Sequence, residues 1–343
     1  MELILIAEVG QTHEGDVDLA VDAVRDFAEA GATHVKFQFL EGARIAKDTA
    51  GPYWHTAPNS SRSQVDLFDS NAIPYSRWDP IVNACDDHGV TFLATPFDTS
   101  AVQWLRTEYG CDELKIASGD ITNRELLQYV NHSGVRRVYL STGASALGEI
   151  SAAMHILIDV PEVVLMACDL SYPTPFTKAQ LGRIDHMTRI FHQRVGYSDH
   201  TTEVSTGFHA ALLGATVLEK HCSLGGDPDV CPDHEMALDP TQFAVYADFA
   251  QEGVAIRARR SLTPAEHEID ARRGARRSLV AKHDIPAGTR LGYDNVTALR
   301  PGPLGTELPA DLIVEAYEAA EWISKGVTLT QRMVSLVDDS EMT

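Results

Sequence analysis

Short apolar runs alternate with longer amphipathic segments over roughly the first 250 residues of the chain. We expect strands at residues 3–7, 33–39, 91–94, 114–117, 137–141, 163–167, 194–198 and 216–220, with helical patterns between them, such as 17–30, 74–88, 99–109 and 122–131. Continuously apolar runs are typical of parallel strands covered by helices. Eight such units predict a TIM (β/α)8 barrel. A doubly wound sheet is disfavoured because the first strand is not followed by a G-x-G-x-x-G turn.

The pattern changes after residue 255, where the barrel is expected to end. Residues 256–277 are rich in arginine and show no strand pattern, so we interpret them as a helical or irregular linker. From residue 278 to residue 343, short apolar runs are separated by turn signals such as Ile285-Pro286-Ala287-Gly288. This pattern predicts a second, small β-rich domain.

The chain is strongly acidic, with 28 Lys and Arg against 49 Asp and Glu and a net charge of −21. This charge argues against a nucleic-acid partner, because phosphate backbones require clustered cations.

No run approaches the ~18 apolar residues of a membrane helix, so we expect a cytoplasmic protein without a membrane partner. The five cysteines form no C-x-x-C pair, which disfavours a disulfide framework or a cysteine zinc cluster.

Polar residues stand at the carboxyl ends of nearly all the expected strands. In a barrel these ends converge on one face, where the active sites of TIM barrels lie. One or two of these residues could simply cap a strand, but their recurrence predicts a binding site. The residues are Glu8, Lys36, Gln38, Thr95, Lys115, Ser118, Ser141, Ser198, His200 and His221.

Two lysines, Lys36 and Lys115, stand inside otherwise apolar strand patterns. A buried ammonium needs a partner, either a protein carboxylate such as Glu8 or a bound anion. Because hydroxyl-bearing residues end the neighbouring strands, we favour a cradle for a phosphate or carboxylate group.

His200 and His221 follow the last two expected strands, which are neighbours in a barrel. Two neutral imidazoles suit Mn, Fe, Co or Zn, although either histidine could be a hydrogen-bonded structural residue. Carboxylates follow the same strands and could orient these groups or perform acid–base chemistry. The sequence does not divide these roles among Glu8, Asp120, Asp199, Glu219 and Asp233.

Together these segments resemble the sialic acid synthase family, whose members condense phosphoenolpyruvate with N-acetylmannosamine or a related sugar. The motifs, in order, are Ala7-Glu8-Val9-Gly10, Val35-Lys36-Phe37-Gln38, Ala94-Thr95-Pro96-Phe97, Lys115-Ile116-Ala117-Ser118-Gly119-Asp120, Ser141-Thr142-Gly143, Tyr172-Pro173-Thr174-Pro175, Ser198-Asp199-His200-Thr201, Glu219-Lys220-His221 and Pro232-Asp233-His234. The segment from Arg277-Ser278-Leu279 to Arg300 is similar to the antifreeze-like (SAF) domain that follows the barrel in this family.

The resemblance implies a role for each site residue. Mn²⁺ or Mg²⁺ would be held by His200 and His221, and Glu8 and Asp120 would be catalytic. The sugar would meet Gln38, Tyr172, Asp233 and Arg300, the last from the partner chain of a homodimer whose SAF domain reaches over the other active site. Phosphoenolpyruvate would be held by Lys36, Thr95, Lys115, Ser118, Ser141 and Ser198.

Three departures from the family pattern, Thr12, Leu170 and Cys222, leave the acceptor sugar open. It could be N-acetylmannosamine, a diacetamido-trideoxyhexose or a sugar without an amino group. Two other classes of function remain as alternatives. One is a lyase or aldolase that forms a Schiff base on Lys36 or Lys115, which needs no metal. The other is a barrel that only binds sugars or phosphates.

Overall fold

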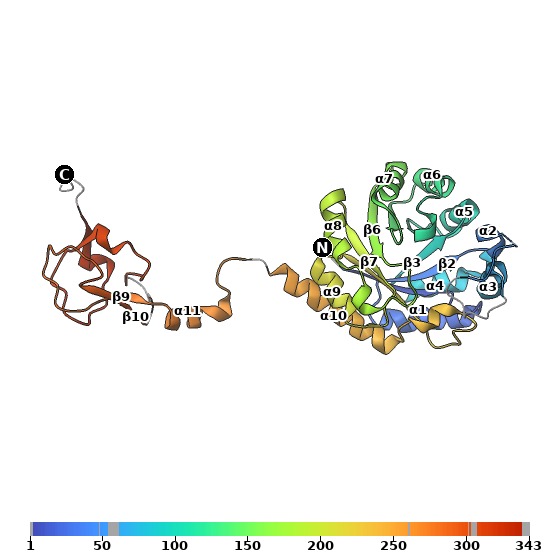
Figure 1. Cartoon of the computed structure of the whole chain (residues 1–343). Helices are drawn as coiled ribbons and strands as arrows, with labels where there is room; N and C mark the ends of the chain where they lie inside the picture. The colour runs from blue at the N-terminus through green and yellow to red at the C-terminus, as the bar shows by residue number, and fades with distance from the viewer. Residues whose placement is uncertain are drawn as a thin grey trace. The chain divides into compact units, whose positions relative to one another are not determined.

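The computed structural model describes residues 3–47, 49–53, 62–259, 261–300, 302 and 307–337, and divides into two compact units, residues 1–259 and 260–343. Each unit is described by itself. The first is built around eight parallel strands (Figure 1). The strands are β1 Ile4–Gly10, β2 His34–Phe39, β3 Thr91–Pro96, β4 Glu113–Ile116, β5 Arg137–Ser141, β6 Glu162–Cys168, β7 Val195–Asp199 and β8 Val217–His221.

The strand order is β3-β2-β1-β8-β7-β6-β5-β4, and every paired neighbour is parallel. The two outer strands of this order, β3 and β4, also lie beside each other, so the sheet curls into a nearly closed barrel. The expected TIM-like barrel is therefore confirmed. Each of the eight predicted strands is present, and several continue into the polar residues that follow the apolar run.

Helices surround the strands (Figure 1), and most of them contribute buried apolar residues to the core around the barrel. Several begin at Asp or Asn residues, such as Asp16, Asp98 and Asn123, whose side chains accept hydrogen bonds from first-turn N–H groups. The helices of this unit are α1 Val17–Glu29, α2 Gly42–Ile45, α3 Gln64–Asn71, α4 Asp79–Asp87, α5 Thr99–Thr107, α6 Arg124–His132, α7 Leu147–Ile156, α8 Gly182–Phe191, α9 Thr206–Leu213 and α10 Pro240–Ala258.

The prediction of one helix over residues 74–88 was wrong in its first turn. The structure has a 3₁₀ turn at Tyr75–Arg77, and α4 begins only at Asp79. Pro80 explains the break, because proline has no N–H to donate and is tolerated only in the first turn of a helix. Trp78, between the two elements, is buried in the core, and its indole N–H donates to the Ile73 carbonyl at 3.1 Å.

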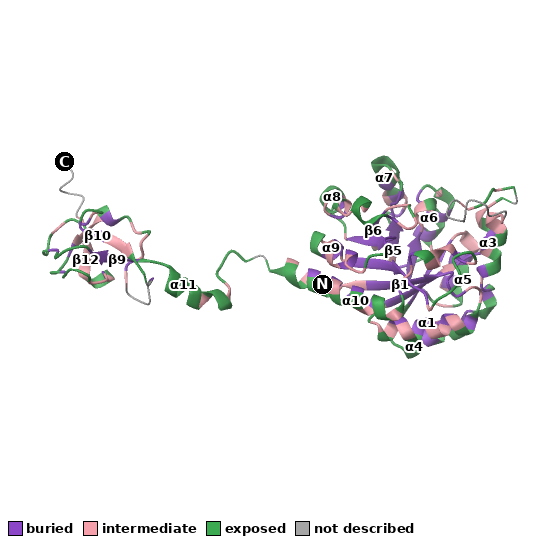
Figure 2. Ribbon diagram, turned by 60° about the horizontal axis from the view of Figure 1, so that its bottom comes forward, coloured by how far each residue is buried: buried purple, intermediate pink, exposed green. Residues whose placement is uncertain are grey.

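Inward-facing side chains form three layers along the barrel axis. The middle layer is apolar and fully buried, and Figure 2 shows that the barrel strands are largely buried. Gly196 belongs to this layer because a Cβ there would lie 2.5 Å from Met166 Sδ and 2.7 Å from the Val217 carbonyl oxygen. The other side chains of the layer are Ile6, Leu93, Tyr139, Val164, Met166 and Val217.

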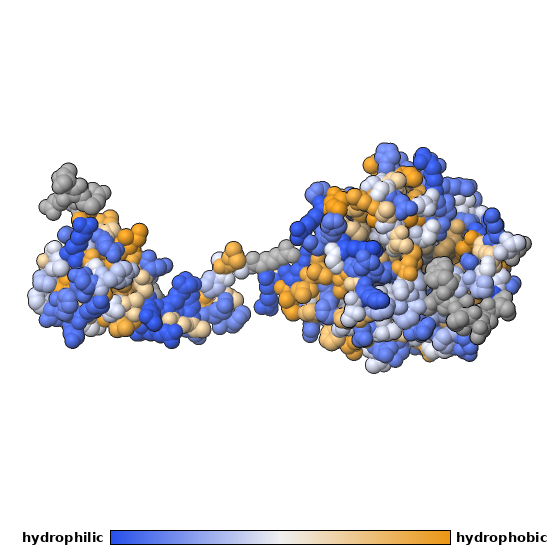
Figure 3. Space-filling model, viewed as in Figure 1, coloured by the Kyte–Doolittle hydropathy of each residue, from blue (hydrophilic) through white to orange (hydrophobic). Residues whose placement is uncertain are grey.

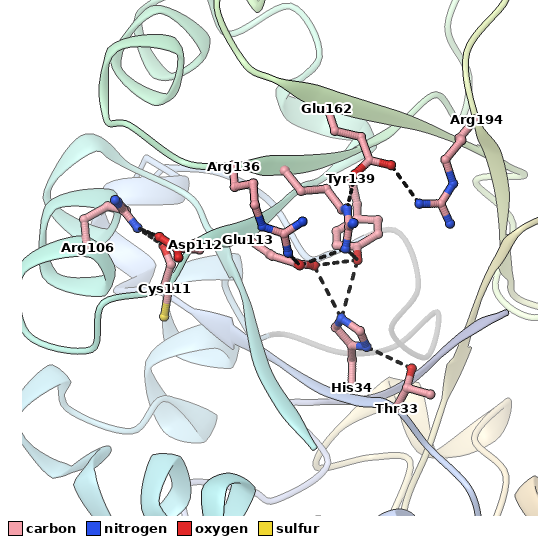
Figure 4. Close-up of polar contacts among 11 residues, drawn as sticks. Thr33, His34, Arg106, Cys111, Asp112, Glu113, Arg136, Tyr139, Glu162 and Arg194 are labelled. Atoms are coloured by element: carbon pink, nitrogen blue, oxygen red, sulfur yellow. Dashed lines mark hydrogen bonds and ion pairs between the residues drawn. The ribbon is translucent and has the colours of Figure 1, made fainter. Parts of the chain in front are cut away.

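A network of charged side chains forms the layer at the amino-terminal ends of the strands (Figure 4). The Glu113 carboxylate accepts hydrogen bonds from Tyr139 at 2.6 Å and from Arg137 at 2.8 Å, and it also pairs with Arg136 and His34. Glu162 pairs with Arg137 and Arg194 at 2.7 Å each. Burial alone would raise the pKa of Glu113, but its hydrogen bonds and the nearby cations lower it to about 2.

The second unit contains α11 Ile269–Ala275 and four short strands, β9 Ser278–Ala281, β10 Val296–Leu299, β11 Tyr317–Ala319 and β12 Val334–Leu336. β9 pairs with β10 and β11 with β12, both antiparallel. A separate small core that includes Leu279, Ile285 and Leu329 lies between them. Arginines of the predicted linker, such as Arg272 and Arg273, are exposed on α11, where Figure 3 shows a hydrophilic surface.

The first compact unit ends at residue 259 and the second begins at residue 260. α10 continues to Ala258, three residues beyond the expected end of the barrel at residue 255, and the described part of the 256–277 segment is largely helical. No helix in the described part of the chain is long and apolar enough to cross a membrane.

We predict that Glu113→Gln lowers the free energy of unfolding of the barrel by about 2 kcal/mol at pH 7, because the variant weakens the charge-assisted hydrogen bonds that the carboxylate accepts from Arg136 and Arg137. A carboxylate with a depressed pKa stabilises the fold above its unfolded-state value of about 4.3, and that stabilisation is lost as the pH falls toward 2. Urea denaturation at a series of pH values measures both effects. The difference between variant and wild type should shrink below pH 4.5.

Asp185→Asn is the control, since Asp185 pairs with Arg189 on the exposed surface of α8 and should not change the unfolding midpoint. A Glu113 variant as stable as the wild type at pH 7 would contradict the prediction.

Candidate active site

A pocket lies at the carboxyl ends of the barrel strands, directly above the apolar layer. Its wall contains twelve of the fourteen site residues expected from the sequence, contributed by strand ends and by the loops that follow them. These residues are Glu8, Lys36, Gln38, Thr95, Lys115, Ser118, Ser141, Tyr172, Ser198, His200, His221 and Asp233.

Strand alternation explains why these side chains converge. Lys36 lies two residues after His34 on β2, and Lys115 lies two residues after Glu113 on β4. Since side chains two residues apart face the same side of a strand, the strands that contribute charges to the amino-terminal layer also contribute charges to the pocket. Ser141 stands in the same relation to Tyr139 on β5.

Buried ion pairs occupy the centre of the pocket. The Lys36 ammonium lies 2.7 Å from a Glu8 oxygen and 3.8 Å from Glu219, and it donates to the Thr95 hydroxyl at 3.1 Å. Lys115 lies 3.2 Å from Glu219, which also accepts a hydrogen bond from Ser198 at 2.8 Å. All of these side chains are buried. Glu219 thus connects both lysines.

The neighbouring charges set the ionisation of this cluster. Burial would raise the pKa of Glu219, but Lys115, Lys36 and the Ser198 hydroxyl lower it to about 2. Burial would likewise lower the pKa of Lys36, but the charges of Glu219 and Glu8 raise it. Both groups are therefore charged at neutral pH. Burial raises the pKa of Glu8, although the charge of Lys36 opposes this effect.

The imidazoles of His200 and His221 face the pocket with their ring centres 5.5 Å apart. His200 donates from Nδ1 to the Asp169 carbonyl at 2.6 Å, so its lone pair is on Nε2, which lies 3.4 Å from the Ser198 hydroxyl. Burial lowers the pKa of His200 to about 4 and lowers that of His221 well below its usual value. Both rings are therefore neutral at pH 7, the form that binds metals.

These two imidazoles are the residues that could hold a divalent cation. Among the described residues, no group of three or more His, Cys, Asp or Glu side chains is arranged around one ion position. Water or substrate oxygens would therefore supply the remaining ligands.

The comparisons with known proteins agree with this geometry. The NeuB family profile matches residues 23–253, and the SAF domain profile matches residues 276–335. The chain belongs to the NeuB family. It is 30% identical to the N,N'-diacetyllegionaminic acid synthase of Campylobacter jejuni, over 87% of this chain and 90% of that protein. An uncharacterised protein of Methanocaldococcus jannaschii is 33% identical over 87% of this chain and 85% of its own length.

Among solved structures, the N-acetylneuraminic acid synthetase of Leptospira borgpetersenii, in complex with citrate, superposes with a TM-score of 0.70 at 28% identity. The match covers 79% of this chain and 90% of that one. The family suggested by the ordered motifs is thus confirmed, together with the SAF domain that follows the barrel.

Loops of this NeuB-family barrel add pocket residues that the strand-end pattern did not identify. Tyr53 and Phe68 contact each other edge to face, with ring centres 5.4 Å apart. Gln11 donates to the Phe68 carbonyl at 3.1 Å and so ties α3 to the loop after β1. Leu67, Phe97 and Cys231 also line the pocket. These residues follow no strand or helix periodicity that would mark them as site residues.

Two expected site residues lie outside this pocket wall. Asp120 ends the 3₁₀ turn Ser118–Asp120, and its carboxylate accepts a hydrogen bond from Asn123 at 2.9 Å. Its catalytic role stays a prediction from the resemblance. Arg300 directly follows β10 in the second unit and is exposed, and its role at the sugar likewise stays a prediction from the resemblance.

Asp233 lies between the pocket carboxylates and His221, whose Nδ1 is 3.5 Å from its carboxylate. Burial, and then the charge of Glu8, raise the pKa of Asp233 to about 7. We predict that Glu8→Gln lowers this pKa, because the variant removes the negative charge that opposes ionisation. A ¹³C NMR titration of protein labelled at aspartate Cγ, assigned with Asp233→Asn, measures the change.

Glu14→Gln is the matched control. Glu14 pairs with the neighbouring His234 at 3.0 Å, so its removal should leave the pKa of Asp233 near 7. Equal pKa values in the Glu8 variant and the wild type would show that the two carboxylates do not interact.

Proposed function

We propose that this protein condenses phosphoenolpyruvate with an N-acylated hexosamine-type aldose, such as N-acetylmannosamine or a relative, to give a nonulosonic acid and phosphate. The observation that carries the proposal is the convergence, in one pocket, of two buried lysines, four hydroxyl groups and two neutral imidazoles. The lysines and the hydroxyl groups suit a small polyanion, and the imidazoles suit a metal ion beside a carbonyl group.

The lysines can bind substrate while remaining paired with the protein. An ammonium has three N–H donors, so Lys36 and Lys115 can each contact a carboxylate and an oxygen of phosphoenolpyruvate. Thr95 and Ser198 contact this cluster directly. Ser118 accepts a hydrogen bond from the Gly143 N–H at 3.0 Å, which places its hydroxyl beside the end of β5 and Ser141. The site can therefore attract an anion into an acidic protein.

The pocket also fits the divalent metal, Mn²⁺ or Mg²⁺, that the family resemblance implies. His200 and His221 would hold it, since both rings are neutral and face the same space. When bound, such an ion polarises a carbonyl oxygen as a Lewis acid. The Tyr172 ring packs against His200 with ring centres 4.2 Å apart and planes tilted by 32°. This ring would orient the imidazole and form part of the wall that a sugar meets.

The reaction forms a carbon–carbon bond, and at C2 it replaces the carbon–oxygen bond to phosphate with a carbon–oxygen bond from water. C3 of phosphoenolpyruvate adds to the aldehyde carbon of the open-chain sugar, whose oxygen takes up a proton. Water adds to C2, and phosphate leaves with the oxygen that joined it to C2. Glu8 is placed to accept the proton of that water, because its carboxylate faces the pocket between Lys36 and Gln38.

Part of the pocket wall suits an acylated amino sugar. It combines aromatic rings from Tyr53, Phe68 and Tyr172 with the amide of Gln38, surfaces that pack against a methyl group and hydrogen-bond to an amide. The Campylobacter and Leptospira relatives are named for products that carry acetyl groups on nitrogen. By the same resemblance we propose a homodimer in which Arg300 of each chain reaches the sugar of the other.

The pairing of the lysines disfavours the Schiff-base alternative. A Schiff base requires a neutral amine, whereas the charges of Glu219 and Glu8 raise the pKa of Lys36 and keep its ammonium protonated. Lys115 is held by Glu219 in the same cluster.

We predict that the protein releases phosphate from phosphoenolpyruvate only with both a divalent metal and one acceptor from a panel of N-acylated hexosamines and plain aldoses. EDTA should abolish the release, and His221→Ala should reduce it at least a thousandfold, because an imidazole ligand is lost. Phosphate assays with phosphoenolpyruvate labelled with ¹⁸O at the bridging position would show the label in phosphate. Label retained in the sugar acid, or near-normal turnover by His221→Ala, would contradict the mechanism.

We further predict that Lys115→Met weakens phosphoenolpyruvate binding about tenfold or more, since a charge-assisted hydrogen bond contributes roughly 1.5–3 kcal/mol. Isothermal titration without sugar measures this affinity. Lys178→Met is the control, because Lys178 is an exposed residue of the 3₁₀ turn Phe176–Lys178. Equal affinity of the Lys115 variant and the wild type would remove this residue from the anion cradle.

A further inference from the structure

A second buried ion pair lies directly behind the pocket, between the ends of β7 and β8. Ser198 and His200 face the pocket from β7 and the residue that follows it, and Glu219 and His221 face it from β8. The residues between them, Asp199 and Lys220, are not part of the pocket wall. They are opposite each other in the strand register, and their charged groups are 3.2 Å apart and completely buried.

The surroundings of this pair hold both charges in fixed positions. Asp199 accepts a hydrogen bond from the Thr201 N–H at 2.9 Å, and Lys220 donates to the Thr201 carbonyl. The Thr201 hydroxyl is 2.8 Å from that of Thr206, at the start of α9. The Lys220 ammonium lies 5.8 Å from the centre of the Tyr246 ring on α10. The pair is therefore tied to strands and helices at once.

A glycine allows this arrangement. A Cβ at Gly207 on α9 would lie 3.0 Å from the Tyr246 ring, so a larger residue there would push the ring away from Lys220. The close packing of α9 and α10 thus places an aromatic face beside the buried ammonium.

A buried ion pair is a costly way to stabilise a fold, because desolvation offsets most of the attraction between the charges. Its specific contribution is geometric, since the two charges fix the distance between the elements that carry them. Asp199 immediately precedes His200, and Lys220 immediately precedes His221. A change in the spacing of this pair would therefore move both imidazoles.

We propose that Asp199 and Lys220 are positioning residues that set the spacing at which His200 and His221 bind one divalent cation. This role rests on the metal site of the proposed function. We therefore expect the Asp199–Lys220 pair to affect the affinity for the cation more than the free energy of unfolding. Suitable variants should change the first quantity without changing the second.

The test is a titration of the metal-free full-length protein with Mn²⁺ alone, followed by electron paramagnetic resonance, with urea denaturation of each variant in parallel. Asp199→Asn/Lys220→Met removes both charges and nearly preserves the volumes. We expect this double variant to unfold at close to the wild-type midpoint and to bind Mn²⁺ at least tenfold more weakly. Each single variant should be less stable than the double variant, because it leaves one buried charge unpaired.

Glu113→Gln is the matched control, since it removes a buried charge at the other end of the same barrel. It should lower the unfolding midpoint without changing the affinity for Mn²⁺. If the double variant does not fold, Asp199→Glu keeps both charges but lengthens one side chain by a methylene, and it should also weaken Mn²⁺ binding.

Wild-type affinity in the folded double variant, or in folded Asp199→Glu if the double variant does not fold, would overturn the positioning role while leaving the metal site intact. A wild-type protein that does not bind Mn²⁺ would instead overturn the two-histidine site, and this role with it. The two failures are therefore distinguishable.

Discussion

The contacts of Glu219 with Lys36 and Lys115 are the interaction on which the pocket depends. Neither lysine could remain charged in the barrel interior without a counter-charge, because the cost of burying an isolated ion exceeds the stability of most folds. Glu219 supplies a counter-charge to both, and Glu8 supplies a second one to Lys36. The ammonium groups that an anionic substrate needs are therefore held in the pocket with their charges balanced by carboxylates.

Strand geometry places these charges at the ends of the barrel and keeps them out of its middle. Inward positions recur every second residue, so each strand contributes about three inward side chains. An apolar layer contributed by the other strands occupies the middle of the barrel, as with Tyr139 between Arg137 and Ser141 on β5. On β2 and β4 the charged inward residues follow each other directly, without an apolar residue between them. The interior is thus divided by a plug that includes Tyr139 and Met166. One end holds an arginine–glutamate network that ties neighbouring strands together, and the other end holds the pocket.

Much of this arrangement could be predicted from the sequence, because polar residues at the carboxyl ends of barrel strands converge on one face. Lys36, Lys115, His200 and His221 were identified by their position after apolar runs, and the structure brings them into one pocket. The sequence left two partners open for the buried lysines, a protein carboxylate or a bound anion. The structure is compatible with both, since Lys36 is paired with Glu8 and also faces the pocket. Glu219 was among the carboxylates whose roles the sequence left undivided, because its partners come from strands far away in the chain.

Other features could not be predicted, for physical reasons. Tyr53 and Phe68 reach the pocket from a loop and from α3, where no alternation marks the inward face. Asp120 follows a strand as the rule requires, but the 3₁₀ turn directs its carboxylate to Asn123. The amino-terminal network was missed because Glu113 and Arg137 stand at the beginnings of strands, where charged residues are ordinary on any solvated surface.

The anchoring of α3 has a consequence for how this barrel can be altered. The helix buries Leu67 and Asn71, and its polar contacts include those from Gln11 to the Phe68 carbonyl, from the Gly42 N–H to Asp69 and from Asn71 to the Val230 carbonyl. None of these contacts involves the buried charges. The loops that face the acceptor can therefore be exchanged as a module, by natural drift or by a protein engineer, while the chemistry stored in the strand ends is inherited unchanged.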